Sequence, residues 1–533
     1  MMKQKEIPYI NPADCAGCSV CVENCPMGCL RIEDPAYHGD IHTKAVLDES
    51  GCIGCGLCAK VCPIRAITMD RGEGSVKRFI NTAADRTSSG RISRHFSGWK
   101  FSRFKGAWEG SCGTKLEGSI HMEEQWSLKK IYCRGFQSVM KVGMYVLPWR
   151  VPKLLKGPGA VKRLPEAIRK KGFQKPLIVT DSQLLKQLHL LDDLLKAMEQ
   201  AGLSYAAYDR VAPNPTDLNV EEGVAIYKEN GCDCMIAFGG GSPMDCAKGI
   251  GARITRPGKS VRQLQGLFRV LLPIPVIFAV PTTAGTGSET TIAAVITESA
   301  THHKASMNDL CLMPKYAVLD PELTVDLPPH VTATTGMDAL CHAVEAYTNH
   351  TYNSALEKKM CRKAVKLIYD NLPVIYRDGS NLKAREHMQK AAFYAGRAFT
   401  RGSVGYVHAI GHTLGGLYGT PHGLAMSILL PHVMRAYGEA AQERLAELCD
   451  VCGIKTADDS VRAKAESFIR WIEDLKEEMQ IPVYPEMILE KDVDQIVEWA
   501  EKEGNPLYPT PQVWRKKEFR EFILSVTPRF GES

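Results

Sequence analysis

Residues 15–26 read CAGCSVCVENCP and residues 52–63 read CIGCGLCAKVCP, so one cysteine spacing occurs twice, 37 positions apart. In each run, two residues separate the first three cysteines, and a fourth cysteine follows three residues later, directly before proline. Three closely spaced thiolates suit three irons of one [4Fe–4S] cube. A zinc site usually shows two separated cysteine pairs, and a disulfide framework is typical of a short secreted chain. Both alternatives fit these runs poorly.

This N-terminal stretch resembles a bacterial-type ferredoxin with two [4Fe–4S] clusters, over residues 7–72. The resemblance implies an α+β module in which the fourth cysteine of each run binds the other cluster. One cluster is then expected on Cys15, Cys18, Cys21 and Cys62. The other is expected on Cys52, Cys55, Cys58 and Cys25.

The chain has 533 residues and a net charge of +6, but the charge is unevenly placed. Residues 71–140 hold 13 Lys and Arg against 6 Asp and Glu, so this stretch carries +7 and the rest about −1. Arginines interleaved with aromatic residues can bind single-stranded nucleic acid. Because no nucleic-acid motif accompanies them, we expect packing or docking to an acidic partner, and no nucleic-acid binding.

The sequence shows neither a targeting signal nor a membrane-spanning segment. No signal peptide precedes Pro8, and the most apolar stretch, Val270–Val280, is too short to span a bilayer. The 19 cysteines fit cluster ligands and reduced thiols better than disulfides. We therefore expect a cytoplasmic protein without membrane association, and exposed clusters favour an anaerobic cell.

From Tyr145 onward, short apolar runs alternate with helical stretches, as in βαβ units. Strands are predicted over 176–180, 234–238 and 275–280. The second strand leads directly into Gly239, Gly240, Gly241, Ser242 and Pro243. Glycine amides and a helix N-terminus, with Ser242 as its cap, favour a bound pyrophosphate. A plain tight turn is the alternative interpretation.

The third predicted strand leads into residues 281–289, which read PTTAGTGSE. Hydroxyl side chains beside glycines can hydrogen-bond phosphate and ribose, and open α/β sheets bind ligands at the carboxyl ends of their strands. Asp181 lies at such an end, after the first strand. A carboxylate there accepts the ribose 2′-OH and repels a 2′-phosphate, which favours NAD over NADP. A helix N-cap is the alternative role for Asp181.

After about Leu327 the periodicity becomes helical. Asp338 and His342 are four residues apart, His408 and His412 repeat that spacing, and His422 follows. Residues four apart share one helix face. A carboxylate with several imidazoles suits Fe(II) or Zn(II) better than Ca or Mg. A single pair of this kind is usually metal-free, but two pairs and a fifth group favour a metal site.

Taken in order, GGGS, PTTAGT, GMDALCH, HAIGH and TPHG resemble the iron-containing alcohol dehydrogenase family over residues 142–533. The resemblance implies that the metal ligands are Asp338, His342, His408 and His422. It implies that His412 lies near the reacting centre without binding the metal. Dinucleotide contacts are expected from Asn214, Gly240, Gly241, Ser242, Thr282, Thr283, Thr291 and Lys304. Arg401 departs from the Asn that many members carry, and Phe399 is the expected pocket wall.

The expected organisation is multidomain. An α+β ferredoxin domain (1–72) and a basic connecting segment (73–141) precede an α/β Rossmann-like NAD-binding domain (142–326) and an all-α metal-binding catalytic domain (327–533). The expected cofactors are two [4Fe–4S] clusters, Fe²⁺ with Zn²⁺ as the alternative, and NAD(H).

The expected reaction interconverts a small alcohol and its aldehyde, with a redox protein as a candidate partner. One alternative is a zinc enzyme resembling glycerol dehydrogenase. Another is an iron–sulfur carrier or docking protein whose dehydrogenase half is inactive. The spacing leaves the oligomeric state open, with a homo-oligomer among the alternatives.

Overall fold

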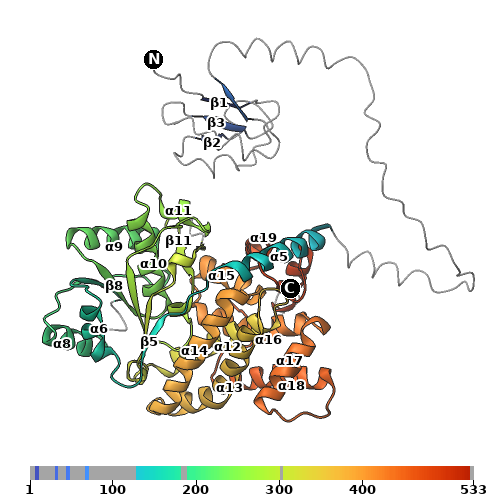
Figure 1. Ribbon diagram of the computed structural model, residues 1–533. Coiled ribbons are helices and arrows are strands. Elements are labelled where there is room, and N and C mark those ends of the chain that lie inside the picture. The colour runs from blue at the N-terminus through green and yellow to red at the C-terminus, as the bar shows by residue number, and fades with distance from the viewer. Residues whose placement is uncertain are drawn as a thin grey trace, which may run out of the picture. The chain divides into compact units, whose positions relative to one another are not determined.

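The computed structural model describes four strands within residues 7–70, and residues 128–181, 189–300 and 304–527. The chain divides into two compact units, residues 1–111 and 112–533 (Figure 1). Among the described helices, none has both the length and the apolar character that crossing a bilayer requires.

In the first unit the strands form two antiparallel pairs. β1 (Ile7–Ile10) pairs with β4 (Ile67–Asp70), and β2 (Leu30–Glu33) pairs with β3 (Lys44–Leu47). One cysteine run lies in sequence between β1 and β2, and the other between β3 and β4. The eight predicted cluster ligands lie outside the described residues, as do any helices of the expected α+β module.

The second unit contains a six-stranded sheet in which every described pairing is parallel, in the order β5-β13-β10-β8-β6-β7. The strands are β5 (Lys153–Lys156), β6 (Pro176–Val179), β7 (Ala206–Tyr208), β8 (Cys234–Gly239), β10 (Val276–Pro281) and β13 (Tyr316–Leu319). The three predicted strands are therefore confirmed as β6, β8 and β10, with ends shifted by at most one residue. Their near-continuous apolar sequence fits a sheet covered on both faces.

Helices cover the two faces of this sheet. On one face α9 (Asp217–Glu229) and α10 (Gly241–Thr255) share a core with β6, β8 and β10. On the other, α6 (Leu164–Lys170) and α8 (Asp192–Gln200) pack with Ile178, Ile236 and Phe278. A small sheet of β9 (Gly266–Leu267), β11 (Ala293–Thr297) and β12 (Lys304–Asn308) packs against α10. The predicted α/β fold of this region is confirmed.

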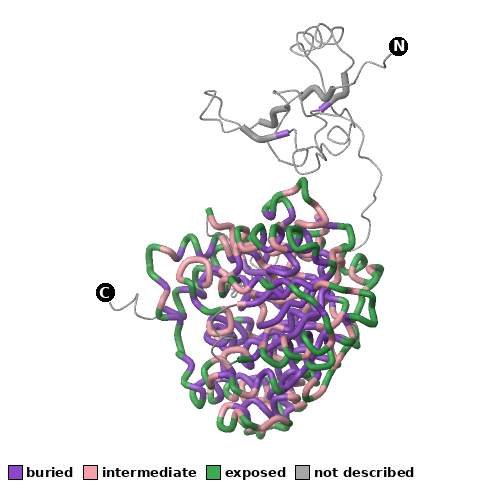
Figure 2. Tube along the Cα trace, turned by 90° about the vertical axis from the view of Figure 1, so that its left-hand side faces the viewer, coloured by how far each residue is buried: buried purple, intermediate pink, exposed green. Residues whose placement is uncertain are grey.

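The C-terminal half is helical, and its largest core surrounds α12 (Pro329–Thr348), of whose 20 residues 15 are buried. A helix buried on nearly all sides belongs at the centre of a bundle. Around it lie α13 (Ala355–Arg377), α14 (Leu382–Gly402), α16 (His422–Ala436) and α17 (Glu439–Cys452). The remaining helices are α15 (Tyr406–Tyr418), α18 (Val461–Glu478), α19 (Val493–Gly504) and α20 (Lys516–Ser525). Figure 2 shows the buried residues concentrated inside this unit.

A further helix, α5 (Leu128–Val146), spans the expected boundary at residue 142. It precedes β5 in the chain but contacts α19 of the helical half. Lys129 forms an ion pair with Glu501 on α19, and Cys133 and Gln137 are buried. Residues 128–141, assigned above to the connecting segment, therefore form part of the second unit.

The two halves of this unit touch through a pair of glycines. A Cβ atom on Gly287, after β10, would lie 2.7 Å from Cα of Gly396 on α14. A Cβ on Gly396 would lie equally close, 2.7 Å, to the carbonyl oxygen of Gly287. Gly287 also has φ of +59°, a conformation that glycine adopts without strain. The backbones of the β10 loop and α14 are thus in direct contact.

Candidate active site

The two predicted nucleotide loops lie against each other at the carboxyl ends of β8 and β10. The amide of Thr282 donates to the carbonyl oxygen of Gly239 at 3.0 Å. A Cβ on Gly240 would lie 3.4 Å from Oγ1 of Thr283, and one on Gly241 would lie 3.0 Å from Cγ2 of Thr286. Glycine thus allows the loops to pack closely and leaves the first amides of α10 beside the hydroxyl-rich loop. A helix N-terminus of this kind favours a bound anion.

The N-cap prediction for Ser242 is wrong. The cap residue of α10 is Gly240, and Ser242 lies inside the first turn, where its hydroxyl donates to the carbonyl oxygen of Pro213. The reason is that the extended backbone needed at a cap falls on Gly240, one residue after the strand. Ser242 instead ties α10 to the loop that carries Asn214.

The structure places the other predicted dinucleotide residues on this side. Lys304 Nζ donates to Oδ1 of Asn214 at 3.1 Å, which brings together two residues 90 positions apart. Asp181 follows β6, the strand next to β8 in the sheet. Thr291 is buried, and its Oγ1 accepts a hydrogen bond from Lys248 at 2.8 Å.

Lys248 on α10 organises the loop after β10. Its buried ammonium also donates to the carbonyl oxygens of Ser288 and Ala293, both at 2.8 Å. Burial lowers the pKa of Lys248 to about 8, while Asp245 opposes the shift. A buried amine surrounded by oxygen acceptors holds loop and helix together. No sequence pattern marks Lys248, because a lysine within a helix carries no signal of burial.

A second cluster lies in the helical half, where Asp338 and His342 project from α12, His408 from α15, and His422 from the start of α16. One potential ligand atom from each of the four lies within 4.8 Å of the others. His422 Nε2 is 3.5 Å from Oδ1 of Asp338, and His342 Nδ1 is 3.8 Å from the same oxygen. Four residues spread over 85 positions of sequence are thus brought to one point.

Three atoms of this cluster are buried and, among the described residues, have no hydrogen-bond partner: Oδ1 of Asp338, Nδ1 of His342 and Nε2 of His408. Burial holds the pKa of His342 and of His422 well below the ordinary range, so both rings are neutral and offer a lone pair. Burial also raises the pKa of Asp338 to about 7, opposed by His408 and Lys304. Unpaired buried polar atoms are costly, and a cation accounts for all three.

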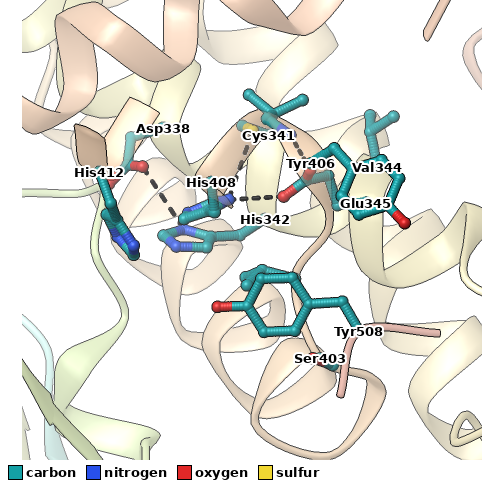
Figure 3. Close-up of polar contacts among 12 residues, drawn as sticks. Asp338, Cys341, His342, Val344, Glu345, Ser403, Tyr406, His408, His412 and Tyr508 are labelled. Carbon is teal, nitrogen blue, oxygen red and sulfur yellow. Dashed lines mark hydrogen bonds and ion pairs between the residues drawn. The ribbon is translucent and has the colours of Figure 1, made fainter. Parts of the chain in front are cut away.

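Glu345 supports this cluster from behind. Its Oε2 lies 2.5 Å from Nδ1 of His408, and its Oε1 accepts the amide of Val407 at 2.8 Å (Figure 3). A carboxylate on the far nitrogen fixes the tautomer and orientation of a ligating imidazole. Glu345 lies on α12 three residues after His342, a spacing that could have revealed it.

Cys341, Glu345 and His408 are also close enough to one another to hold a metal. However, both oxygens of Glu345 are engaged by protein groups. Burial raises the pKa of Cys341 well above its ordinary value, so its sulfur remains a thiol rather than a thiolate. This trio therefore supports His408 and does not form a second metal site.

His412, predicted near the reacting centre, stacks on His422 with ring centroids 5.3 Å apart. Its Nδ1 lies 2.7 Å from Oε1 of Glu503, and that oxygen also accepts the hydroxyl of Tyr508 at 2.8 Å. Both partners come from the C-terminal end of the chain, where no motif or spacing marks them.

Two further predictions concern the surroundings of the cluster. Phe399 stacks on His342 with ring centroids 4.1 Å apart, so it lies directly against the Asp and His cluster. Arg401 faces the other way: it forms an ion pair with Glu357 at 3.5 Å and lies over the ring of Tyr145 on α5. Arg401, the residue that departs from the family pattern, therefore contacts α5.

Comparison with known proteins agrees with this fold. The family model "Iron-containing alcohol dehydrogenase" matches residues 152–321, and "Fe-containing alcohol dehydrogenase family, C-terminal" matches residues 332–525. The model "4Fe-4S dicluster domain" matches residues 14–66.

Among relatives, 1,3-propanediol dehydrogenase of Citrobacter freundii is 38% identical over 371 residues, which are 69% of this chain and 95% of the relative. NAD-dependent methanol dehydrogenase of Bacillus methanolicus is 37% identical over 367 residues, 68% of this chain and 96% of the relative. The crystal structure of a 1,3-propanediol oxidoreductase aligns with a TM-score of 0.68 at 37% identity, covering 72% of this chain and all of that one. Alcohol dehydrogenase from Oenococcus oeni aligns with a TM-score of 0.68 at 35% identity, over 71% and 100%.

A parallel nucleotide-type sheet joined to a buried Asp and His cluster, with these matches, defines an NAD-dependent oxidoreductase. The chain belongs to the iron-containing alcohol dehydrogenase family, with a 4Fe-4S dicluster sequence ahead of the family region. The predicted resemblance is confirmed for both parts.

Proposed function

We propose that the second unit catalyses reversible NAD(H)-dependent interconversion of a small alcohol and its aldehyde, with iron bound by Asp338, His342, His408 and His422. The observation that carries this proposal is the convergence of three buried, unpaired ligand atoms on one point. The names of the relatives, which include 1,3-propanediol and methanol dehydrogenases and a lactaldehyde reductase of Escherichia coli, support a short alcohol as substrate.

The chemistry divides between the two loops and the cluster. A metal bound there would supply a Lewis acid for the substrate oxygen. The first amides of α10, at Gly240 and Gly241, would hold the pyrophosphate of NAD, and Thr282 and Thr283 would contact it from the facing loop. Lys304 and Asn214 lie beside the start of α10, because Ser242 ties that helix to the loop that carries Asn214. Phe399 would exclude water on the substrate side, and His412 would take up the alcohol proton at Nε2.

The metal and the substrate are tested together. The full chain would be purified without oxygen, its bound metals measured, and NADH formation followed over a panel of short alcohols and diols. We expect about one iron per chain beyond the cluster iron and turnover with at least one short alcohol. Full activity with zinc and none with iron would favour the zinc alternative. No turnover with any substrate at full metal occupancy would favour the inactive-carrier alternative.

For the N-terminal part we propose two [4Fe–4S] clusters that serve docking to a redox partner or redox sensing. Hydride transfer moves two electrons together, whereas a cluster of this type passes one at a time. The described residues offer no flavin site to connect the two. The clusters therefore would not supply electrons to NAD directly.

The full chain with Cys18→Ser and Cys55→Ser tests this role. We expect each substitution to reduce the cluster absorbance and to leave NADH-linked turnover unchanged. Loss of NADH-linked turnover in a variant that keeps its fold and its catalytic metal would mean that the clusters and the dehydrogenase are catalytically coupled.

A further inference from the structure

The helix α5 lies ahead of residue 152, where the match to the family begins, yet it is bound to the active-site half of the enzyme. Gln137 is 1% exposed, and its Nε2 donates to the carbonyl oxygens of Pro506 at 3.1 Å and Tyr508 at 2.9 Å. Arg134 donates to Gln137 Oε1 at 2.8 Å and to the carbonyl oxygen of Pro511 at 2.9 Å. The helix is thus hydrogen-bonded at three points to the loop that follows α19.

This loop, residues 505–511, connects α5 to the site through one side chain. The Tyr508 hydroxyl donates to Oε1 of Glu503 at 2.8 Å, and the same oxygen lies 2.7 Å from Nδ1 of His412. A series of contacts therefore runs from Gln137 to His412: Gln137 bonds the backbone carbonyl of Tyr508, and the Tyr508 hydroxyl and His412 share one oxygen of Glu503. Figure 3 shows Tyr508 and His412 in the same view as the Asp338 and His408 side chains.

We infer that Glu503 and Tyr508 are positioning residues for His412, and that α5 is a structural part of the active site because it holds their loop. Glu503 accepts the Nδ1 proton of the His412 ring, which fixes one tautomer and leaves Nε2 free of a proton. Tyr508 keeps the Glu503 carboxylate in one orientation, and Gln137 fixes the backbone at Tyr508. Supporting groups of this kind make a site rigid enough for proton transfer. The inference rests on the proposed role of His412.

Three variants of the full-length protein test the series: Glu503→Gln, Tyr508→Phe and Gln137→Leu. Their controls are Glu498→Gln on an exposed turn of α19, Tyr484→Phe at an exposed tyrosine, and Ser138→Ala on the exposed side of α5. We expect kcat to fall about tenfold or more in Glu503→Gln, a part of the roughly 100- to 10,000-fold that a positioned proton-transfer group itself contributes. We expect smaller losses in the other two. KM for NAD and bound metal should stay unchanged in all three.

Two further measurements separate positioning from general destabilisation. A larger solvent deuterium isotope effect on kcat is expected in Glu503→Gln and Tyr508→Phe, because proton transfer becomes slower than hydride transfer. Faster hydrogen exchange of residues 505–511 is expected in Gln137→Leu, and Glu503→Asp should recover part of the lost kcat. The controls should change none of these quantities.

An unchanged kcat in Glu503→Gln at full metal content would overturn the assignment of Glu503. Faster exchange of the loop in Gln137→Leu with wild-type kcat would overturn the role of α5. If the wild type turned over no alcohol, the proposed function itself would fail. The exchange measurement does not need turnover, and unchanged exchange in Gln137→Leu would then overturn the α5 part independently.

Discussion

The carboxylate of Glu345 lies 2.5 Å from Nδ1 of His408, although the two residues are 63 positions apart. This contact leaves Nε2 of His408 as the atom that faces Asp338 and His342, and Nε2 has no partner among the described residues. Outer partners of ligating histidines typically contribute a factor of 10 to 100 in metal affinity or activity.

Replacing Glu345 by Gln should therefore weaken metal retention by about 10- to 100-fold without unfolding the protein. The measurement is metal content after dialysis against a graded series of chelator concentrations. Glu477→Gln, at an exposed position of α18, is the matched control and should retain metal as the wild type does. Equal retention in Glu345→Gln would show that His408 needs no fixed tautomer.

His342→Ala should abolish turnover and lower metal content together, because it removes one of four converging ligands from a buried site. The remaining Asp338 carboxylate would lack its cation, so the thermal midpoint should also fall. His330→Ala is the control, since His330 lies on the same helix but is exposed. Near wild-type turnover with full metal content in His342→Ala would contradict the ligand assignment.

Gly285→Ala should destabilise the enzyme and raise KM for NAD. A Cβ at Gly285 would lie 2.6 Å from the carbonyl oxygen of Thr335 on α12, so the loop after β10 must shift. Overpacking of this kind costs about 1–3 kcal/mol. At Gly258 a Cβ would meet nothing within 4 Å, so Gly258→Ala should match the wild type in thermal midpoint and KM. Equal values for the two variants would show that the loop yields without cost.

The enzyme should prefer NAD(H) to NADP(H), and Asp181→Gly should narrow the preference. Asp181 follows β6, and a carboxylate at this end of the sheet repels a 2′-phosphate. The measurement is kcat/KM for both cofactors in wild type and variant, with Asp193→Gly on the exposed side of α8 as the control. A wild type that already prefers NADPH would show that Asp181 does not face the ribose.

Lys476→Met should stabilise the protein below pH 8 and lose that advantage as the pH approaches 10.5. Burial lowers the pKa of Lys476 to about 8, opposed by Glu473 on the same helix; His432 and Arg435 lie on the facing helix, α16. Between pH 8 and 10.5 the unfolded chain binds more protons than the native one, so the free energy of unfolding of the wild type rises with pH. Below pH 8 the free energy of unfolding of Lys476→Met should exceed that of the wild type by on the order of 3 kcal/mol. Chemical denaturation at pH 7 and 10 measures it, and a constant difference would contradict the prediction.

The sequence was most informative where the signal was local. The strands at β8 and β10 could be predicted because an apolar run followed by glycines marks a buried strand and its turn. The cluster of Asp338, His342, His408 and His422 could be named because two pairs share helical spacing and match a family pattern. In both cases each separate motif is only a few residues long.

The remaining features depend on contacts between distant residues. Glu503 lies 91 positions after His412, and Tyr508 lies 371 positions after Gln137, so no spacing connects them. The helix α5 was assigned to a connecting segment because its four basic and no acidic residues continue the charge of the preceding stretch. Its buried face holds a cysteine and a glutamine rather than an apolar stripe, so its pattern did not indicate burial.

The contact between Gly287 and Gly396 restricts how the two halves of the enzyme can move. Hinged enzymes usually open a cleft by changing a few backbone angles at their connections. Here the nucleotide-side loop and α14 already touch backbone to backbone, three residues before the Phe399 that stacks on His342. We therefore expect the halves to rock about this point rather than to slide across it. Opening for exchange of NAD would then be widest at the end far from this contact, towards the adenosine.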